Sequence, residues 1–178
     1  IYGDSDLVGR GGGTTTVRES FEWDKLSDPS GDGTLIDNGD YFTHATQDTG
    51  YVNVTFSKIA YSQSPHTTFA TNQQKVHSIT DDGQPVNAYS SLSSELNADE
   101  ESATYRWTFD KPVSNLSFRI NDIDYSSEVL IKAYDINGNL VPISTSTGSG
   151  IKAQNLDGVG GNEWLVSNSG YLSSNPAD

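Results

Sequence analysis

Cysteine and methionine are both absent from this chain of 178 residues, and basic residues are scarce. Without cysteine the chain has no disulfides, no zinc–thiolate sites and no cysteine nucleophile, so a hydrophobic core or another kind of cross-link must stabilise it. No apolar run is long enough to cross a membrane, and no segment has the pattern of a signal peptide. Because the chain starts at Ile1 and lacks methionine, we expect it to be a segment of a longer protein.

The scarcity of basic residues leaves a strong negative charge. Lys and Arg number 10 against 24 Asp and Glu, which gives a formal net charge of −14. Such a surface repels nucleic acid and anionic lipid, so we expect no nucleic-acid partner and no membrane insertion. Calcium prefers oxygen ligands from carboxylates, amides and backbone carbonyls. The acidity therefore indicates either bound calcium as a cofactor or a surface that keeps the protein soluble in salty surroundings.

Long helical patterns are also missing, and strand patterns take their place. Short segments rich in Thr, Val, Ile and aromatic residues often alternate apolar with polar positions. Asn137-Gly138 separates two of these segments, which is a strong hairpin signal, and only residues 90–102 suit a short helix. The pattern predicts an all-β protein with little helix, an antiparallel β-sandwich of jelly-roll-like or immunoglobulin-like shape. The expected strands are residues 14–23, 51–61, 67–79, 103–113, 115–123, 128–135 and 139–144.

The length of the chain favours a single domain. A chain of 178 residues with 33% hydrophobic content can bury one core, so we expect one domain over residues 1–178. Residues 9–13 are rich in glycine and residues 169–178 are polar, and we expect both segments to be flexible.

Two of the expected strands show which face is buried. Period two places Tyr105, Trp107 and Phe109 on one face of their strand, which we expect to point into the core. Residues 128–135 carry apolar side chains at both odd and even positions, so this strand is expected to be covered on both sides.

The acidic residues that follow the apolar run ending at Ile120 are the first candidates for a metal site. In the sequence RINDID, alternation points Asp122 and Asp124 to the same side at the end of the strand. Two carboxylates on one face, together with a loop carbonyl, begin a calcium shell of roughly six to eight oxygens. The alternative is that both carboxylates accept hydrogen bonds from turn amides or pair with Arg119 or Arg106.

Three further loops combine acidic residues with glycine. These loops are residues 3–6, 31–40 and 156–164. Their candidate metal ligands are Asp4 and Asp6 in the first loop, Asp32, with Asp37 and Asp40, in the second, and Asp157, with Asn162 and Glu163, in the third. None of the loops matches the calcium-binding loop of an EF-hand. We therefore interpret each one either as an oxygen-rich ion site or as a solvated turn.

The third of these loops is also a candidate ligand site. Its glycines allow backbone amides to converge on an anion, and its asparagine adds a polar side chain. Trp164 of this loop region and Tyr125, which follows the RINDID run, could offer an apolar or stacking face to a ligand. The alternative is that both rings belong to the core. The predicted ligand-binding residues are Gly158, Gly160, Gly161, Asn162, Trp164 and Tyr125.

Catalytic motifs are missing as well. The chain contains no G-x-S-x-G, H-E-x-x-H or G-x-x-x-x-G-K-[ST] motif. His44, His66 and His77 lie in unrelated contexts, and the many carboxylates single out no acid pair of a glycosidase. We therefore expect a protein that is not an enzyme and has no catalytic residues, with a hydrolase as the less favoured alternative.

Residues 109–139 carry a pattern that resembles bacterial surface β-sandwich domains: F-x-x-P-V-x-x-L-x-F-x-I-x-D-I-D, then a strand and a YD-x-x-G-N hairpin. The matching positions are Phe109, Pro112, Val113, Leu116, Phe118, Ile120, Asp122, Ile123, Asp124, Tyr134, Asp135, Gly138 and Asn139. Acidic and free of cysteine, the chain is similar to the ligand-binding domain near the C-terminal end of RTX adhesins, above all to the calcium-dependent peptide-binding type. Of the ligands of that family, only Asp122 and Asp124 are carried over to this sequence.

The resemblance implies a secreted, extracellular β-sandwich on the bacterial cell surface that holds several structural calcium ions. It also implies that a further calcium coordinates the carboxylate at the C-terminus of a target peptide, for cell adhesion and biofilm formation. We expect a monomer as an isolated domain, with the C-terminus of a surface protein as its partner. The alternatives are a lectin-like module that binds a surface glycan, and a structural spacer of a surface stalk that binds no ligand.

Overall fold

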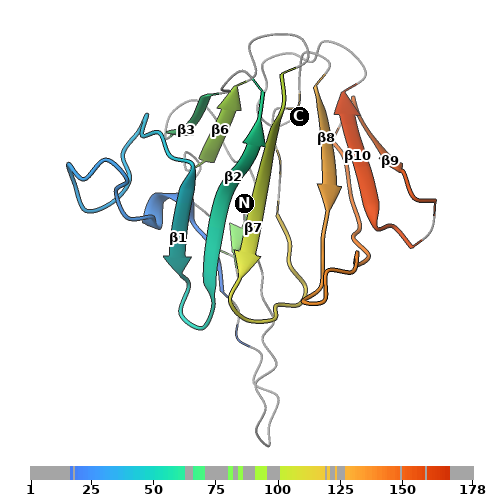
Figure 1. Cartoon of the computed structure of the whole chain (residues 1–178), viewed down its shortest axis with the longest axis horizontal. Coiled ribbons are helices and arrows are strands. Elements are labelled where there is room, and N and C mark those ends of the chain that lie inside the picture. The colour runs from blue at the N-terminus through green and yellow to red at the C-terminus, as the bar shows by residue number, and fades with distance from the viewer. Residues whose placement is uncertain are drawn as a thin grey trace, which may run out of the picture. The chain divides into compact units, whose positions relative to one another are not determined.

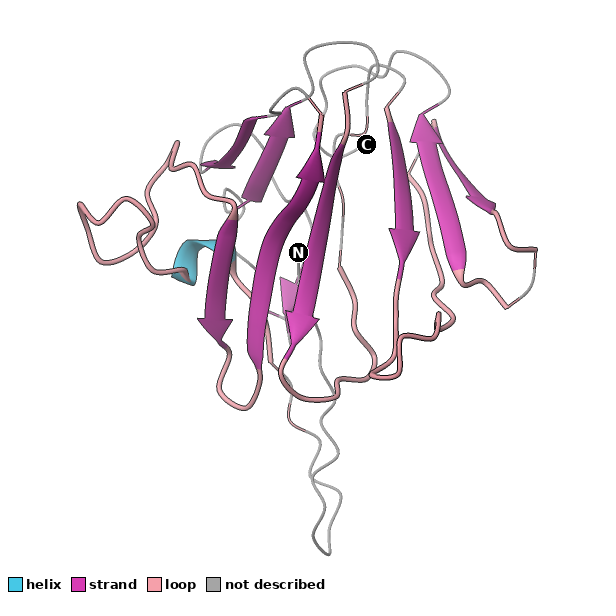
Figure 2. Ribbon diagram, in the orientation of Figure 1, coloured by secondary structure: helices cyan, strands magenta, loops and turns pink. Residues whose placement is uncertain are grey.

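The computed structural model of the protein describes residues 17, 19–62, 66–70, 80–81, 84–85, 91–95, 101–118, 120, 123, 127–148, 150–158 and 160–168. Regular structure in these residues is almost entirely β-strand, and every strand pair among them is antiparallel (Figures 1 and 2). The prediction of an all-β, antiparallel protein with little helix is confirmed. Within the same residues, no helical segment has the length and apolar character that crossing a membrane requires.

The chain divides into two compact units, residues 1–119 and residues 120–178. Each unit contains one three-stranded sheet, and the first unit also contains two-stranded sheets. The single domain over residues 1–178 stays a prediction. The expected flexible ends at residues 9–13 and 169–178 lie outside the described residues.

The first unit is built on a three-stranded sheet of order β1-β2-β7. Its strands are β1 (His44–Asp48), β2 (Asn53–Tyr61) and β7 (Ala103–Phe109). Two further antiparallel pairs join β3 (His66–Ala70) to β6 (Ser91–Glu95), and β4 (Thr80–Asp81) to β5 (Gln84–Pro85). A single 3₁₀ turn, η1 (Trp23–Lys25), precedes the first strand.

An aromatic core joins the sheets of the first unit. Phe56 of β2 is fully buried, and Phe69 of β3 belongs to the same cluster of buried side chains. The Trp23 ring contacts the Phe56 ring edge-on, with 5.2 Å between the ring centroids. Leu92 of β6 packs against this cluster from its partly buried position. Two sheets therefore share one core, which is the layered arrangement of a sandwich.

The alternation predicted for β7 is correct. Tyr105, Trp107 and Phe109 are all partly buried and pack against the core of the first unit, while the residues between them are exposed. In β2, a β-bulge shifts the pairing with β7 between Lys58 and Ala60. Val54, Phe56 and Lys58 are buried, but Ala60, which alternation would place on the same face, is exposed, so the inward–outward alternation breaks at the bulge.

The second unit contains a three-stranded sheet of order β8-β10-β9. Its strands are β8 (Glu128–Lys132), β9 (Ile151–Asn155) and β10 (Glu163–Asn168). After β8 the chain turns back through a hairpin that is closed by a bridge between Tyr134 and Leu140. Gly138 adopts a φ of 82° in this turn, which agrees with the Asn-Gly hairpin signal.

Asp135 organises this hairpin turn. Its carboxylate accepts hydrogen bonds from the side-chain amide and the backbone N–H of Asn139, and from the backbone N–H of Asn137. These donors favour the charged form and lower the pKa of Asp135. The D-x-x-G-N part of the recognised pattern thus has a local structural role that needs no ligand.

Several predicted elements are wrong in the described residues. Residues 91–95 of the expected helix form strand β6, because Leu92 pairs with Phe69 and packs on the core. Residues 19–22 and 115–118 lie in expected strands but have no strand structure. Residues 139–144 form only an isolated bridge rather than a strand. For β6, tertiary packing decided what the local pattern left open.

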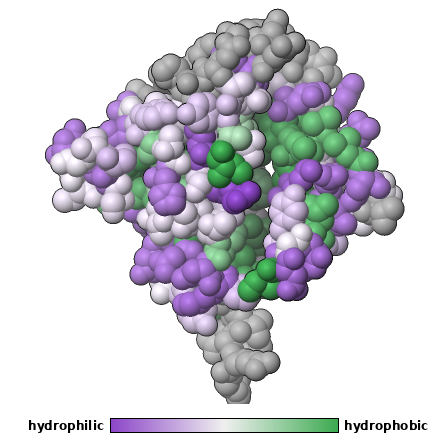
Figure 3. Space-filling model, in the orientation of Figure 1, coloured by the Kyte–Doolittle hydropathy of each residue, from purple (hydrophilic) through white to green (hydrophobic). Residues whose placement is uncertain are grey.

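The prediction that β8 is covered on both faces is also wrong. Val129 and Ile131 are partly buried, but Leu130 is 51% exposed and Tyr134 is 59% exposed. Apolar side chains accordingly reach the surface over this sheet (Figure 3). On the same face Lys132 pairs with Glu163 across β8 and β10, and this hydrogen-bonded contact raises the pKa of Lys132.

Candidate functional site

The loop that joins β9 to β10 brings together most of the predicted ligand-binding residues. Gly158, Gly160 and Gly161 have φ angles of 65°, 71° and 67°, so the backbone passes repeatedly through the left-handed region that favours glycine. The backbone N–H of Asn162 donates to Oδ2 of Asp157 at 3.2 Å. The loop therefore uses one of its own amides to hold its own carboxylate, rather than leaving that amide to an external anion.

Trp164 fixes the base of the β9–β10 loop. Its indole Nε1–H donates to the backbone oxygens of Ile143 and Gly161, at 3.0 and 3.1 Å. The backbone N–H of Ile143 returns a hydrogen bond of 2.9 Å to the oxygen of Gly161. The ring is partly buried, so it ties the loop to the preceding segment. Its stacking against a ligand stays a prediction.

One side-chain oxygen of this loop lacks a hydrogen-bond donor. Oδ1 of Asn162 is buried and accepts no hydrogen bond in the described part of the chain. A buried carbonyl-type oxygen without a donor is costly, and a bound cation or water satisfies it. Oδ1 lies 3.3 Å from the place that a Cβ on Gly160 would occupy, so a side chain there would crowd it. Carboxylate, amide and backbone oxygens are together the donor set that calcium uses, and the residues of this loop fit that ion.

A second oxygen-rich loop lies in the first unit, between Ser27 and Leu35, which form an antiparallel bridge. Oδ1 of Asp28 accepts hydrogen bonds from the backbone N–H and the hydroxyl of Ser30, and Oδ2 accepts one from the backbone N–H of Gly33. The Ser30 hydroxyl, followed by the Gly33 amide, holds the pKa of Asp28 well below its usual range. Asp28 therefore stays ionised as the organising group of this loop.

Three oxygens gather beside Gly33 in this loop. The place that a Cβ on Gly33 would fill lies 3.6 Å from Oδ2 of Asp28, 3.6 Å from the backbone oxygen of Leu35 and 3.7 Å from Oδ2 of Asp37. Because Gly33 has no side chain, the space between the two carboxylates and the carbonyl is open. This donor set also fits a hard divalent cation such as calcium.

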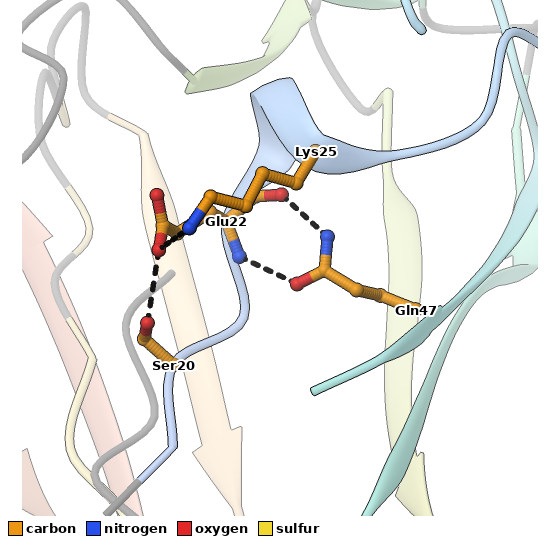
Figure 4. A network of polar contacts seen from close by, with 4 residues as sticks. All are labelled: Ser20, Glu22, Lys25 and Gln47. Atoms are coloured by element: carbon orange, nitrogen blue, oxygen red, sulfur yellow. Dashed lines mark hydrogen bonds and ion pairs between the residues drawn. The ribbon is translucent and has the colours of Figure 1, made fainter. Parts of the chain in front are cut away.

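A pocket of about 330 Å³ adjoins η1 in the first unit. Its lining residues include Glu19, Glu22 and Asp48, together with Lys25 and Gln47. The Gln47 side chain spans the gap between β1 and η1: its amide nitrogen donates to the backbone oxygen of Glu22 at 2.7 Å, and its oxygen accepts from the backbone N–H of Glu22 at 2.9 Å (Figure 4). Gln47 is only 7% exposed, so this paired contact is a fixed part of the wall.

The structure describes part of the predicted site. The candidate metal ligands Asp4, Asp6, Asp122 and Asp124, and the candidate ligand-binding Tyr125, lie outside the described residues. Asp32 is exposed in the turn between Asp28 and Gly33. Asp157 lies in the β9–β10 loop with the predicted glycines and Asn162, and Trp164 follows this loop in β10. Within the described residues, no three acidic or histidine side chains converge as a metal-binding group.

Sequence reasoning missed Asp28 and the residues that line the pocket beside η1. Asp28 opens the turn sequence DPSGDG, and an aspartate at the start of such a turn is a recognisable signal for an Asx-type cap. Glu19 and Gln47 carry no such signal, because their partners lie about 25 or more residues away in the chain.

Comparisons of the chain with protein-family models, with curated proteins and with solved structures found no match.

Replacing Gly161 by alanine is expected to lower the free energy of unfolding by about 2 kcal/mol. Its φ of 67° is strained for alanine, and the new Cβ would lie 3.0 Å from the backbone oxygen of Ile143. Gly138→Ala is the matched control, because Gly138 has a φ of 82° but no atom within 4 Å of the added Cβ. It should cost about 1 kcal/mol from strain alone. Equal losses for both variants in urea unfolding would show that Ile143 does not constrain the loop.

Proposed function

We propose that the chain is a calcium-dependent ligand-binding module of a secreted bacterial adhesin that recognises the exposed C-terminus of a surface peptide. The observation that carries the proposal is the β9–β10 loop, which holds Asp157 beside the buried, unpartnered Oδ1 of Asn162. A calcium ion at this loop would satisfy the amide oxygen, and the carboxylate of a peptide would supply further oxygens to the same ion.

A second calcium has a structural role in this proposal. The Asp28, Leu35 and Asp37 oxygens around Gly33 would hold an ion within the first unit and cross-link a loop that no disulfide can cross-link. Ions at both loops would also offset part of the formal charge of −14. The protein performs no chemistry in this proposal: it binds outside the cell, as a monomer, for adhesion and biofilm formation.

The test is a binding assay with a panel of short peptides that have free C-termini, and with the same panel amidated at the C-terminus. Peptides with a free carboxylate should bind in millimolar calcium and lose binding in EDTA, and the amidated panel should not bind. Asp157→Asn should weaken this binding, whereas Glu128→Gln, which removes one exposed charge from β8, should not. Equal binding of the amidated peptides would contradict a carboxylate-directed site.

A lectin-like module that binds a surface glycan is the second candidate, and a pair of tyrosines favours it. Tyr41 and Tyr61 are each 54% exposed, and the ammonium of Lys58 lies 5.6 and 4.4 Å from their ring centroids. Exposed aromatic rings near a polar group suit stacking on a sugar. Competition by simple sugars, but not by peptides, would favour this candidate, and the absence of any ligand would favour a structural spacer.

A further inference from the structure

We propose that Asp157 is a site of spontaneous backbone modification, because the fold leaves the nitrogen of Gly158 free to attack it and form an isoaspartyl linkage. This nitrogen attacks Cγ of Asp157, and its proton leaves with the carboxyl hydroxyl as water, which closes a succinimide ring. Water then opens the ring. Opening at Cγ restores aspartate, and opening at the main-chain carbonyl carbon leaves isoaspartate. The reaction needs no partner other than water and does not depend on the proposed function.

Glycine is the residue after which this ring closes with the least hindrance, because no Cβ shields the attacking nitrogen. An aspartate or asparagine precedes glycine at several places in the described residues. These are Asp32–Gly33, Asn38–Gly39, Asn137–Gly138 and Asp157–Gly158, whereas Asp82–Gly83 lies outside the described residues. What separates these places is the hydrogen bonding of the glycine nitrogen.

At all of these described places except Asp157–Gly158, the glycine N–H is held in a hydrogen bond. The N–H of Gly33 donates to Oδ2 of Asp28 at 2.5 Å, that of Gly39 to the backbone oxygen of Phe69 at 2.8 Å, and that of Gly138 to the backbone oxygen of Asp135 at 3.0 Å. A nitrogen has to give up this bond before it can lose its proton and attack. The free energy of the broken hydrogen bond therefore adds to the barrier.

The N–H of Gly158 is not held in this way. It donates no hydrogen bond to any residue that the structure describes, and Gly158 is exposed. The place that a Cβ on Gly158 would fill has no atom within 4 Å, whereas the same place on Gly33 has three oxygens within 3.7 Å. A succinimide ring therefore has room to form at Gly158, and no hydrogen bond has to break at its nitrogen.

Asp32–Gly33 is a matched comparison within the same chain, because the reacting groups are identical. Asp32 is exposed and Asp157 is partly buried, so exposure alone would favour reaction at Asp32. The hydrogen bond from Gly33 to the carboxylate of Asp28 acts in the opposite direction. A hydrogen bond to a charged group is strong enough to slow such a step about tenfold or more. The hydrogen bond outweighs the exposure, and Asp157 reacts first.

Isomerisation changes the β9–β10 loop at its carboxylate. Oδ2 of Asp157 accepts the backbone N–H of Asn162 at 3.2 Å. In isoaspartate the side-chain methylene becomes part of the main chain, and the remaining carboxylate is the former main-chain carbonyl. This carboxylate no longer stands opposite the Asn162 amide, so the loop loses the contact that closes it.

The test is incubation of the native protein in EDTA at neutral pH and physiological temperature over several weeks. Proteolysis and electron-transfer dissociation then distinguish isoaspartate from aspartate at each position. Isoaspartate should accumulate about tenfold faster at Asp157 than at Asp32. In concentrated urea both positions should react at similar rates, because the fold no longer protects Asp32. Equal rates in the native protein, or a preference for Asp157 that persists in urea, would overturn the proposal.

Variants test the two parts of the argument. Asp157→Asn and Asp32→Asn place an asparagine before glycine, where the same ring forms with loss of ammonia, and deamidation is read as a mass increase of the peptide. The first variant should deamidate about tenfold faster than the second. Asp28→Ala releases the Gly33 N–H and should raise the rate at Asp32 about tenfold, while the rate at Asp157 in the other unit stays unchanged. An unchanged rate at Asp32 in this variant would show that the hydrogen bond does not control the reaction, and would overturn the proposal.

Discussion

Adding millimolar calcium to the chelator-treated protein is expected to raise its melting temperature by about 5–10 °C, whereas magnesium is not. An ion that binds only the folded state stabilises it by RT ln(1 + [L]/Kd), which is about 2.7 kcal/mol at a hundredfold excess over Kd. The oxygens around Gly33 and the unpartnered oxygen of Asn162 are the atoms that such an ion would satisfy. Magnesium demands a compact octahedral shell and retains its waters, so it is the appropriate control.

Two variants separate the loops in this experiment. Asp37→Asn should reduce the part of the calcium shift that comes from the first unit, and Asn162→Leu should reduce the part that comes from the second. Glu128→Gln, at an exposed position on β8, should leave the shift unchanged. If calcium causes no shift in the parent protein, the acidity serves solubility, and the calcium-dependent function loses its main physical support.

The strands could be predicted where side-chain alternation and burial agree. In β7, Tyr105, Trp107 and Phe109 face one core, and the period of two in the sequence states this directly. In β6 the serine-rich sequence SLSSE resembles a helix start, and only pairing with β3 makes it a strand. That pairing joins residues about 25 positions apart, which local sequence does not encode.

The candidate sites also divide into those that local sequence encodes and those that depend on contacts between distant segments. The β9–β10 loop could be predicted because its glycines, Asp157 and Asn162 are contiguous in the chain, and a contiguous loop places its own oxygens close together. Asp28 and Asp37 both lie near Gly33 for another reason: the bridge between Ser27 and Leu35 folds the chain back on itself and brings the segments on either side of the loop together. The acid pocket depends on Gln47 meeting Glu22 across 25 residues, and no spacing rule anticipates that contact.

Replacing Trp23 by alanine is expected to lower the free energy of unfolding of the first unit by about 3–5 kcal/mol. Trp23 is 3% exposed, and its ring lies 4.8 Å from the ring of Phe21 and 5.2 Å from that of Phe56, between centroids. Alanine would leave a large cavity at the centre of this aromatic cluster and would release η1 from the core. The measurement is differential scanning calorimetry of the variant and the parent protein.

The control for Trp23→Ala also tests how the chain is divided. Ile136→Ala removes a side chain that is 90% exposed in the second unit, and it should cost less than about 0.5 kcal/mol. If residues 1–119 and 120–178 unfold independently, Trp23→Ala should move one calorimetric transition and leave the other in place. If the whole chain unfolds in one transition that moves as a unit, the single-domain prediction is supported. A small effect of Trp23→Ala in either case would contradict the aromatic cluster as the core of the first unit, and the pocket that η1 borders would lose its rigid support.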